Sequence, residues 1–92
     1  MSIFENHTNL VKYENGNYLF KYGDKYGWVV TNRTESTYDM YPIEWLNDND
    51  YKKVLGIFPS FPAVLTYLSE VDVMRFIVRL KEEITYGVKN VQ

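Results

Sequence analysis

The chain has 92 residues, of which 46% are apolar and 24% are charged, and this size and composition fit a single globular domain with one core. The net charge of −2 is too small to be informative as a total, and the lack of cysteine excludes disulfides, thiolate metal sites and a cysteine nucleophile. The first residues do not resemble a signal peptide, and no apolar run is long enough to span a bilayer. Together with the Asn-, Lys-, Tyr- and Ile-rich composition, these features predict a cytoplasmic protein of a bacterium or a phage-infected host cell.

The first half of the chain predicts an antiparallel β-meander of three to four strands. Asn15 and Gly16 form a pair that tolerates the positive φ angles of a tight hairpin turn, and Gly23 begins a second turn. On the strands around these turns, aromatic and apolar side chains alternate, so that Tyr18, Phe20 and Tyr22 share one face. Such a sheet needs one face covered by another element. The predicted strands span residues 10–13, 18–22, 26–31 and 35–41.

The second half predicts helices. Asp50 is placed to cap a short helix that Gly56 ends, and Pro62 suits the first turn of a second helix. Ser69 is the predicted cap of the longest helix, which Gly87 ends. The predicted helices span residues 51–55, 62–68 and 70–86.

The longest predicted helix has one continuous apolar face, formed by Val73, Phe76, Ile77, Leu80 and Ile84. A further set widens this stripe and predicts contacts on two sides of the helix: Val71, Met74 and Val78. The predicted fold class is therefore α+β, with an N-terminal antiparallel β-meander of three to four strands packed against C-terminal helices in one domain over residues 1–92.

The sequence contains no complete motif for catalysis, cofactor binding or metal binding. His7 is the only histidine, it lies in a polar stretch near the N-terminus, and no serine sits in a nucleophile elbow. Residues 47–50 resemble the start of a calcium loop, but Lys53 stands where that loop needs glycine and Pro59 where it needs glutamate. We therefore predict a protein that is not an enzyme and that carries no cofactor or metal.

The strongest charge signal lies between Arg33 and Lys52, where the chain has five acidic residues and no basic one. Aromatic residues interleave with these acids, and aromatic anchors ringed by charge are typical of protein-binding surfaces. Trp45 is the predicted exposed anchor, although it could instead fill the core while the acids are simply solvated. The predicted partner-binding residues are Glu35, Asp39, Tyr41, Glu44, Trp45, Asp48, Asp50 and Tyr51.

The leading hypothesis is a non-enzymatic inhibitor or neutraliser of the kind that phages and mobile elements direct against host defences, or an immunity protein. It would dock the acidic surface onto a basic groove of a larger protein, such as a nucleic-acid-handling enzyme. This hypothesis requires an exposed Trp45 and a buried Trp28.

Two alternatives stay open. In the first, aromatic and basic residues of the hairpin bind single-stranded nucleic acid, which requires an exposed Trp28 or Tyr26. Only one surplus positive charge over residues 10–35 weighs against that alternative. In the second, the chain is a structural subunit that forms a homodimer through an edge strand.

Overall fold

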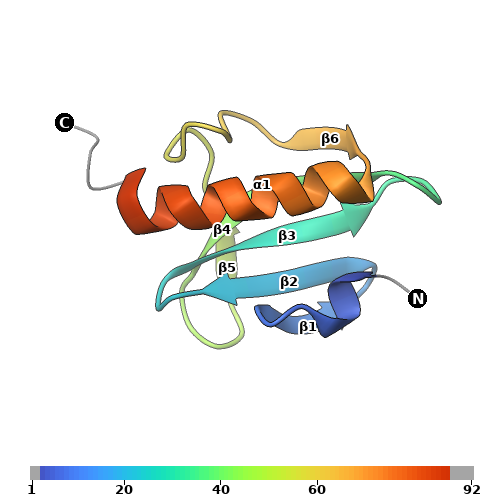
Figure 1. Cartoon of the computed structure of the whole chain (residues 1–92). Coiled ribbons are helices and arrows are strands. Elements are labelled where there is room, and N and C mark those ends of the chain that lie inside the picture. Colours follow the sequence, from blue (N-terminus) through green and yellow to red (C-terminus); the bar gives the residue numbers. More distant parts are fainter. Residues whose placement is uncertain (1–2, 88–92) are drawn as a thin grey trace.

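The computed structural model describes residues 3–87 and shows a six-stranded antiparallel sheet with one α-helix lying across it (Figure 1). A short 3-10 helix, η1 (Ile3–Asn6), precedes the sheet, and a π-helical turn, η2 (Glu83–Gly87), follows the α-helix. The strands are β1 (Leu10–Glu14), β2 (Asn17–Tyr22), β3 (Tyr26–Asn32), β4 (Tyr38–Trp45), β5 (Tyr51–Lys53) and β6 (Leu65–Leu68), and the α-helix is α1 (Glu70–Glu82).

The predicted meander is confirmed. Asn15 and Gly16 have φ angles of 53° and 82° and close the β1–β2 hairpin, in which Tyr13 pairs with Tyr18. Gly23, with φ of 76°, lies in the turn from β2 to β3. The strands run in the order β1-β2-β3-β4-β5, and β6 also pairs with β4. The sheet therefore has more strands than the three to four expected.

The two additional strands replace the two short predicted helices, so those helix predictions are wrong. Tyr51 pairs with Trp45, and Leu68 pairs with Tyr38, so β5 and β6 hydrogen-bond to different parts of β4. A long central strand offers unpaired backbone groups along its edge, and pairing with them outweighs the weak local preference of a short segment for helix.

The longest helix is confirmed, and Ser69 caps it. The side chain of Ser69 accepts a hydrogen bond from the backbone N–H of Asp72 at 3.1 Å. The buried residues of α1 are Val73, Ile77 and Leu80, and they pack on the face of the sheet that we call the inner face. The aromatic and apolar residues that the sheet contributes to this core are Tyr18, Phe20, Trp28, Val30, Tyr38 and Met40.

The connection from β5 to β6 closes one end of the core. Phe58 and Phe61 are buried, and their rings contact Tyr26 and Phe76 at centroid separations of 5.1 Å and 5.8 Å. Within residues 3–87 the inner side of the sheet is thus covered by one α-helix, by this connection and by η1, whose Phe4 is completely buried against Tyr18, Phe20 and Tyr38.

The widened stripe on α1 packs only in part as predicted. Val71 and Val78 are 62% and 57% exposed, and Met74 is half-buried. Met74 packs against the core beside the narrower face, whereas Val71 and Val78 point away from it, because one sheet can cover only one side of a helix.

Candidate functional site

The face of the sheet opposite α1, which we call the outer face, carries a second apolar cluster. Leu19 of β2, Val29 of β3 and Ile43 of β4 are completely buried there. Larger side chains from β4 and β5 pack on these residues, and we call them the aromatic cluster: Tyr41, Trp45 and Tyr51. The structure therefore brings the three aromatic residues of the predicted binding set together on one face.

Trp45 is the centre of this cluster, but it is buried, with only 7% of its surface exposed. Its Nε1 donates a hydrogen bond of 3.0 Å to the carbonyl oxygen of Phe20. Gly27 makes room for the indole, because a Cβ at that position would overlap the Phe20 carbonyl oxygen and would lie 2.9 Å from Trp45 Nε1.

The expectation of an exposed Trp45 anchor is consequently wrong. The fourth strand does not end at residue 41 as predicted; β4 continues through Pro42 to Trp45. Because side chains alternate along a strand, this continuation turns Trp45 onto the outer face beside Ile43, where the sheet itself covers the indole.

Tyr51 and Tyr41 complete the cluster. The rings of Tyr51 and Trp45 meet edge to face at a centroid separation of 5.3 Å, and the Nζ atom of Lys53 lies 4.6 Å from the centroid of Tyr41. Burial, and to a lesser degree the neighbouring Tyr51, raises the pKa of Tyr41 above its ordinary value. Both tyrosines are half-buried, so each is in part exposed to solvent.

A small pocket of about 170 Å³ opens beside the cluster and is lined by Val11, Lys21, Trp45 and Asp48. Trp45 thus lines a concave surface although its side chain is largely buried. This volume lies below the range of roughly 300–1,000 Å³ that is usual for small-molecule sites, so the pocket suits a single inserted side chain.

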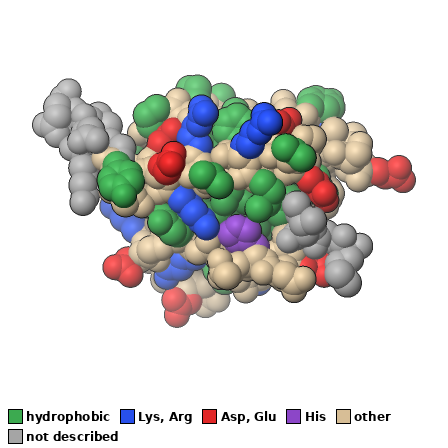
Figure 2. Space-filling view, viewed as in Figure 1, with side chains coloured by type: hydrophobic (Ala, Val, Ile, Leu, Met, Phe, Trp, Pro, Cys, Tyr) green, Lys and Arg blue, Asp and Glu red, His purple; other side chains and the backbone are tan. Residues whose placement is uncertain are grey.

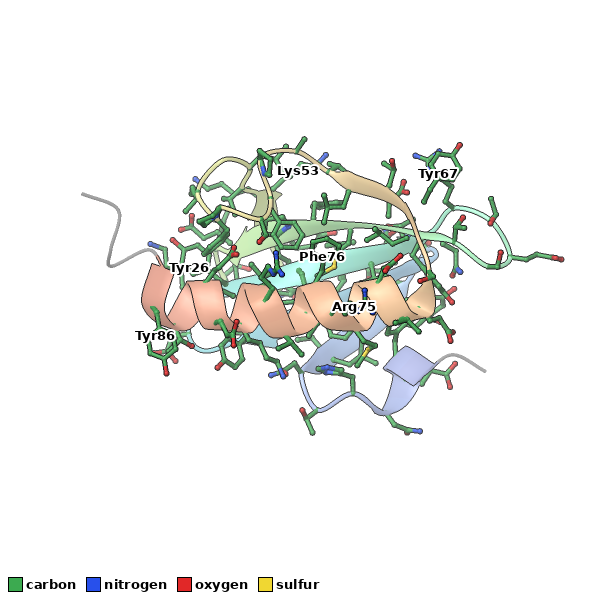
Figure 3. All side chains as sticks on the ribbon, turned by 45° about the horizontal axis from the view of Figure 1, so that its top comes forward. Tyr26, Lys53, Tyr67, Arg75, Phe76 and Tyr86 are labelled. Carbon is green, nitrogen blue, oxygen red and sulfur yellow. The ribbon has the colours of Figure 1, made fainter. Side chains whose placement is uncertain are left out.

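Asp39, on the outer face of β4, is occupied by internal bonds. Arg33 donates two hydrogen bonds of 2.7 Å to its two carboxylate oxygens, and the backbone N–H of Tyr67 donates a third at 3.3 Å. The bonds from Arg33, chiefly, hold the pKa of Asp39 below its ordinary value. Arg33 also lies over the ring of Tyr67, which Figure 3 labels beside β6. Asp39 therefore links the end of β3, β4 and β6.

Glu44 and Glu35 lie away from the aromatic cluster. Alternation along β4 places Glu44 on the inner-face side, where its two carboxylate oxygens lie 3.8 Å from the Nζ atoms of Lys25 and Lys52. Glu35 precedes β4, and the eight residues of that strand separate it from Asp48 by roughly 25 Å. The five acids therefore do not form the single surface that their sequence order indicates.

Asp48 and Asp50 lie together in the turn between β4 and β5. The turn is held by Asn47, whose Oδ1 accepts hydrogen bonds from the backbone N–H groups of Asn49 at 2.8 Å and Asp50 at 2.9 Å. Both aspartates are exposed, and within residues 3–87 neither takes part in an ion pair. Asn47 Nδ2 also donates a hydrogen bond of 3.0 Å to the Asp50 carboxylate, so two carboxylates without a basic partner among the described residues lie next to the aromatic cluster.

Sequence reasoning missed four contributors to this site: Val11, Lys21, Gly27 and Lys53. The period of two along a strand could have indicated two of them, since Lys21 follows Leu19 and Lys53 follows Tyr51 at that spacing. Gly27 and Trp45 lie on different strands, so no local sequence pattern predicts their contact.

The two aromatic residues that the nucleic-acid alternative requires to be exposed, Trp28 and Tyr26, are covered, whereas Tyr13 of β1 is 55% exposed. Trp28 is completely buried on the inner face, and Tyr26 is half-buried against Phe58. The exposure that the nucleic-acid alternative requires is therefore not present, because α1 and the β5–β6 connection cover these rings.

Among the described residues, no group of three or more His, Asp or Glu side chains could hold a metal ion. No helix within residues 3–87 has the length and apolar character needed to cross a membrane. Comparisons with known protein families, with curated proteins and with solved structures find no match to this chain.

Proposed function

We propose that the protein is a non-enzymatic binding protein that docks the outer face, at the β4–β5 hairpin, onto another protein. The observation that carries the proposal is the gathering of Tyr41, Trp45 and Tyr51 beside a side-chain-sized pocket and the unpaired Asp48. Aromatic rings that are already held in place lose little conformational freedom on binding, which suits them to interface centres.

The charge of the hairpin turn supports a basic partner. The turn carries Asp48 and Asp50 and no basic residue, and both carboxylates are exposed. Unpaired charge at the rim of an interface mainly accelerates the encounter with an oppositely charged surface. A larger protein with a basic groove, such as a nucleic-acid-handling enzyme, is the partner class that we propose, and inhibition of that enzyme is the proposed consequence.

The proposed binding set is smaller than the set predicted from the sequence. Asp39 is paired with Arg33, Glu44 lies between two lysines, and Glu35 lies at the other end of β4. The residues that we assign to binding are Val11, Lys21, Tyr41, Trp45, Asp48, Asp50 and Tyr51. Trp45 acts as the fixed floor of the pocket and not as a protruding anchor.

The test is an affinity capture from host-cell lysate with two matched double variants. Asp48→Lys with Asp50→Lys reverses the charge of the turn, and Glu5→Lys with Glu35→Lys makes the same net change at exposed acids elsewhere. We expect the first variant to weaken capture of one stoichiometric protein by about tenfold and to reduce its salt dependence. The control variant should capture that protein as the wild type does.

Equal capture by the two double variants would show that the hairpin turn is not the docking surface. Tyr51→Ala separates contact from charge, because it should speed dissociation while leaving the association rate nearly unchanged. Capture of nucleic acid that nuclease removes, with no protein partner, would overturn the proposal.

A further inference from the structure

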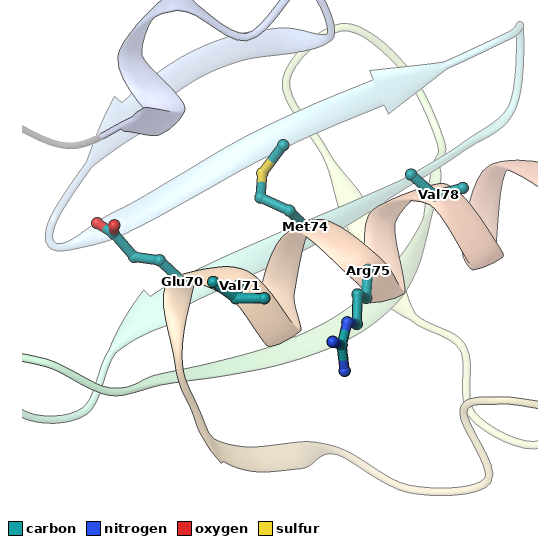
Figure 4. Close-up of a pocket in the computed structure, with 5 residues that line it drawn as sticks. All are labelled: Glu70, Val71, Met74, Arg75 and Val78. Carbon is teal, nitrogen blue, oxygen red and sulfur yellow. The ribbon is translucent and has the colours of Figure 1, made fainter.

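The hollow on the outward side of α1 has charged groups that are already engaged. It has a volume of about 390 Å³ and is lined by Glu70, Val71, Met74, Arg75 and Val78 (Figure 4). Figure 2 shows hydrophobic side chains exposed over this layer of the molecule, with Lys or Arg side chains among them. The Glu70 carboxylate accepts a hydrogen bond of 3.1 Å from the Tyr38 hydroxyl, and the Arg75 guanidinium lies 4.0 Å from the Asp72 carboxylate. Both charged groups of this hollow therefore have partners within the chain.

The pocket beside the aromatic cluster differs in this respect. Its volume is about 170 Å³, and Lys21 and Asp48 line it together with Val11 and Trp45. Within residues 3–87, neither the Lys21 ammonium nor the Asp48 carboxylate takes part in an ion pair. The two groups come from different elements, β2 and the β4–β5 turn, and they do not pair with each other. The pocket thus offers a donor from one element and an acceptor from another.

The backbone that carries the Lys21 side chain is fixed. The Lys21 N–H donates a hydrogen bond of 2.9 Å to the carbonyl oxygen of Asn9, and Asn9 Nδ2 donates one of 3.1 Å to the carbonyl oxygen of Lys21. Asn47 holds the turn that carries Asp48 in a similar way, through its bonds to the next residues of that turn. Both charged side chains therefore extend from ordered positions, which favours a pocket with a defined preference.

The hydrogen-bonding capacity of the two groups determines which side chain fits. Lys21 can only donate, and the Asp48 carboxylate can only accept. A basic occupant would bond to Asp48 but would be repelled by Lys21, and an acidic occupant would meet the opposite problem. A primary amide carries an acceptor oxygen and a donor NH2 group on separate atoms of one plane, so it can bond to both residues at once.

The second carboxylate of the turn does not change this preference. Asp50 is not among the residues that line the pocket, and its carboxylate accepts a hydrogen bond of 3.0 Å from Asn47 Nδ2. Val11, which is 48% exposed, and the indole of Trp45 supply apolar contact for a methylene stem. The pocket therefore combines apolar walls with one free donor and one free acceptor.

We propose that this pocket binds a primary amide and that the side chain which a partner protein inserts there is glutamine or asparagine. The inference rests on the proposed function, because it names the group that the partner places at the docking surface. Basic residues of the partner then face the exposed carboxylates around the pocket and do not enter it. Lys21 is accordingly a residue that determines specificity, since it excludes basic side chains from the pocket.

The test uses small probes of similar size on the 92-residue chain without any partner. Propionamide, propylammonium and propionate are titrated separately, and binding is followed by NMR of the isotopically labelled protein. We expect propionamide to shift the N–H signals of Lys21, Trp45 and Asp48. Its dissociation constant should be at least about threefold lower than that of either charged probe.

Variants that remove one charge should change the preference in opposite directions. Lys21→Met should make propylammonium the tightest probe, and Asp48→Asn should make propionate the tightest, each by about threefold. Lys52→Met and Glu35→Gln are the matched controls, because Lys52 lies beside Glu44 on the inner-face side and Glu35 lies at the other end of β4. Both controls should prefer propionamide as the wild type does, and the NMR spectra show whether each variant is folded.

A wild-type chain that prefers a charged probe would overturn the inference, as would the absence of local shifts with propionamide up to about 200 mM. An unchanged preference in Lys21→Met would overturn it as well. Any of these results, combined with capture that depends on the charge of the turn, would reject the amide and leave the docking surface in place. A clear amide preference combined with equal capture by the two double variants would instead reject the docking surface and support the amide site.

Discussion

His7 lies at the boundary between the N-terminal segment and the inner core. Its ring packs edge to face on Phe20 and Trp28, at centroid separations of 5.3 Å and 6.3 Å. The Nδ1 atom accepts a hydrogen bond of 3.1 Å from the backbone N–H of Asn9, as expected for a locally bonded histidine. Partial burial, and secondarily the charge of Lys81, lowers the pKa of His7 below its ordinary value of 6.5.

The lowered pKa of His7 predicts a loss of stability in weak acid. Between the folded-state and unfolded-state pKa values the unfolded chain binds the proton more readily, so the free energy of unfolding decreases as the pH falls below about 6.5. The check is urea denaturation at several pH values for the wild type and for His7→Asn, whose side chain can still accept from Asn9. Between about pH 7 and pH 5, the range in which an ordinary histidine titrates, the wild type should lose more stability than the variant. An equal loss of stability in the two proteins would contradict the prediction.

Ser69 shows at the scale of an element how a local sequence signal fixes a helix boundary. Its side chain caps the first turn of α1, and Glu70 and Asp72 add negative charge at the positive end of the helix dipole. Removal of the cap leaves a backbone N–H without its partner.

Ser69→Ala should lower the free energy of unfolding by about 1 kcal/mol, measured by urea denaturation. Ser69→Asp keeps an acceptor at the cap and should retain most of the stability. Ser36→Ala, at an exposed loop position, should change the free energy by less than about 0.5 kcal/mol. If Ser69→Ala and Ser36→Ala have equal effects, the cap does not stabilise the helix.

Elements with strong local signals were predictable, and elements that depend on distant partners were not. The Asn15-Gly16 turn and the Ser69 cap each involve groups within a few residues of one another, so both can be predicted from the sequence. β5 and β6 exist because β4 supplies their hydrogen-bonding partners, and a three- or four-residue strand has little preference of its own.

At the scale of the whole molecule, one sheet separates two apolar layers. Trp28 lies in the inner layer and Trp45 in the outer one, and β2, β3 and β4 contribute side chains to both. Because neither layer can lose its packing without loss of the strands that they share, we expect both to unfold in a single cooperative transition.

Single-tryptophan variants test this expectation. Trp45→Phe leaves Trp28 as the fluorescent reporter of the inner layer, and Trp28→Phe leaves Trp45 as the reporter of the outer layer. The Nε1 atom of Trp28 has no hydrogen-bond partner among the described residues, so its replacement breaks no such bond. In each variant the fluorescence and far-UV circular dichroism midpoints should coincide. A Trp45 transition that precedes the loss of strand signal would mean that the outer layer opens independently.

By itself the sequence determined the α+β class, the β-meander, the capped long helix and the membership of Tyr41, Trp45, Asp48, Asp50 and Tyr51 in one short segment. These features follow from short-range periodicity and turn chemistry. Only the tertiary structure decided that Trp45 is buried over Gly27, that Asp39 and Glu44 are paired with bases, and that one side of α1 stays uncovered. The physical reason is that strand pairing, burial and charge pairing join residues far apart in the chain, and their free energies exceed local preferences.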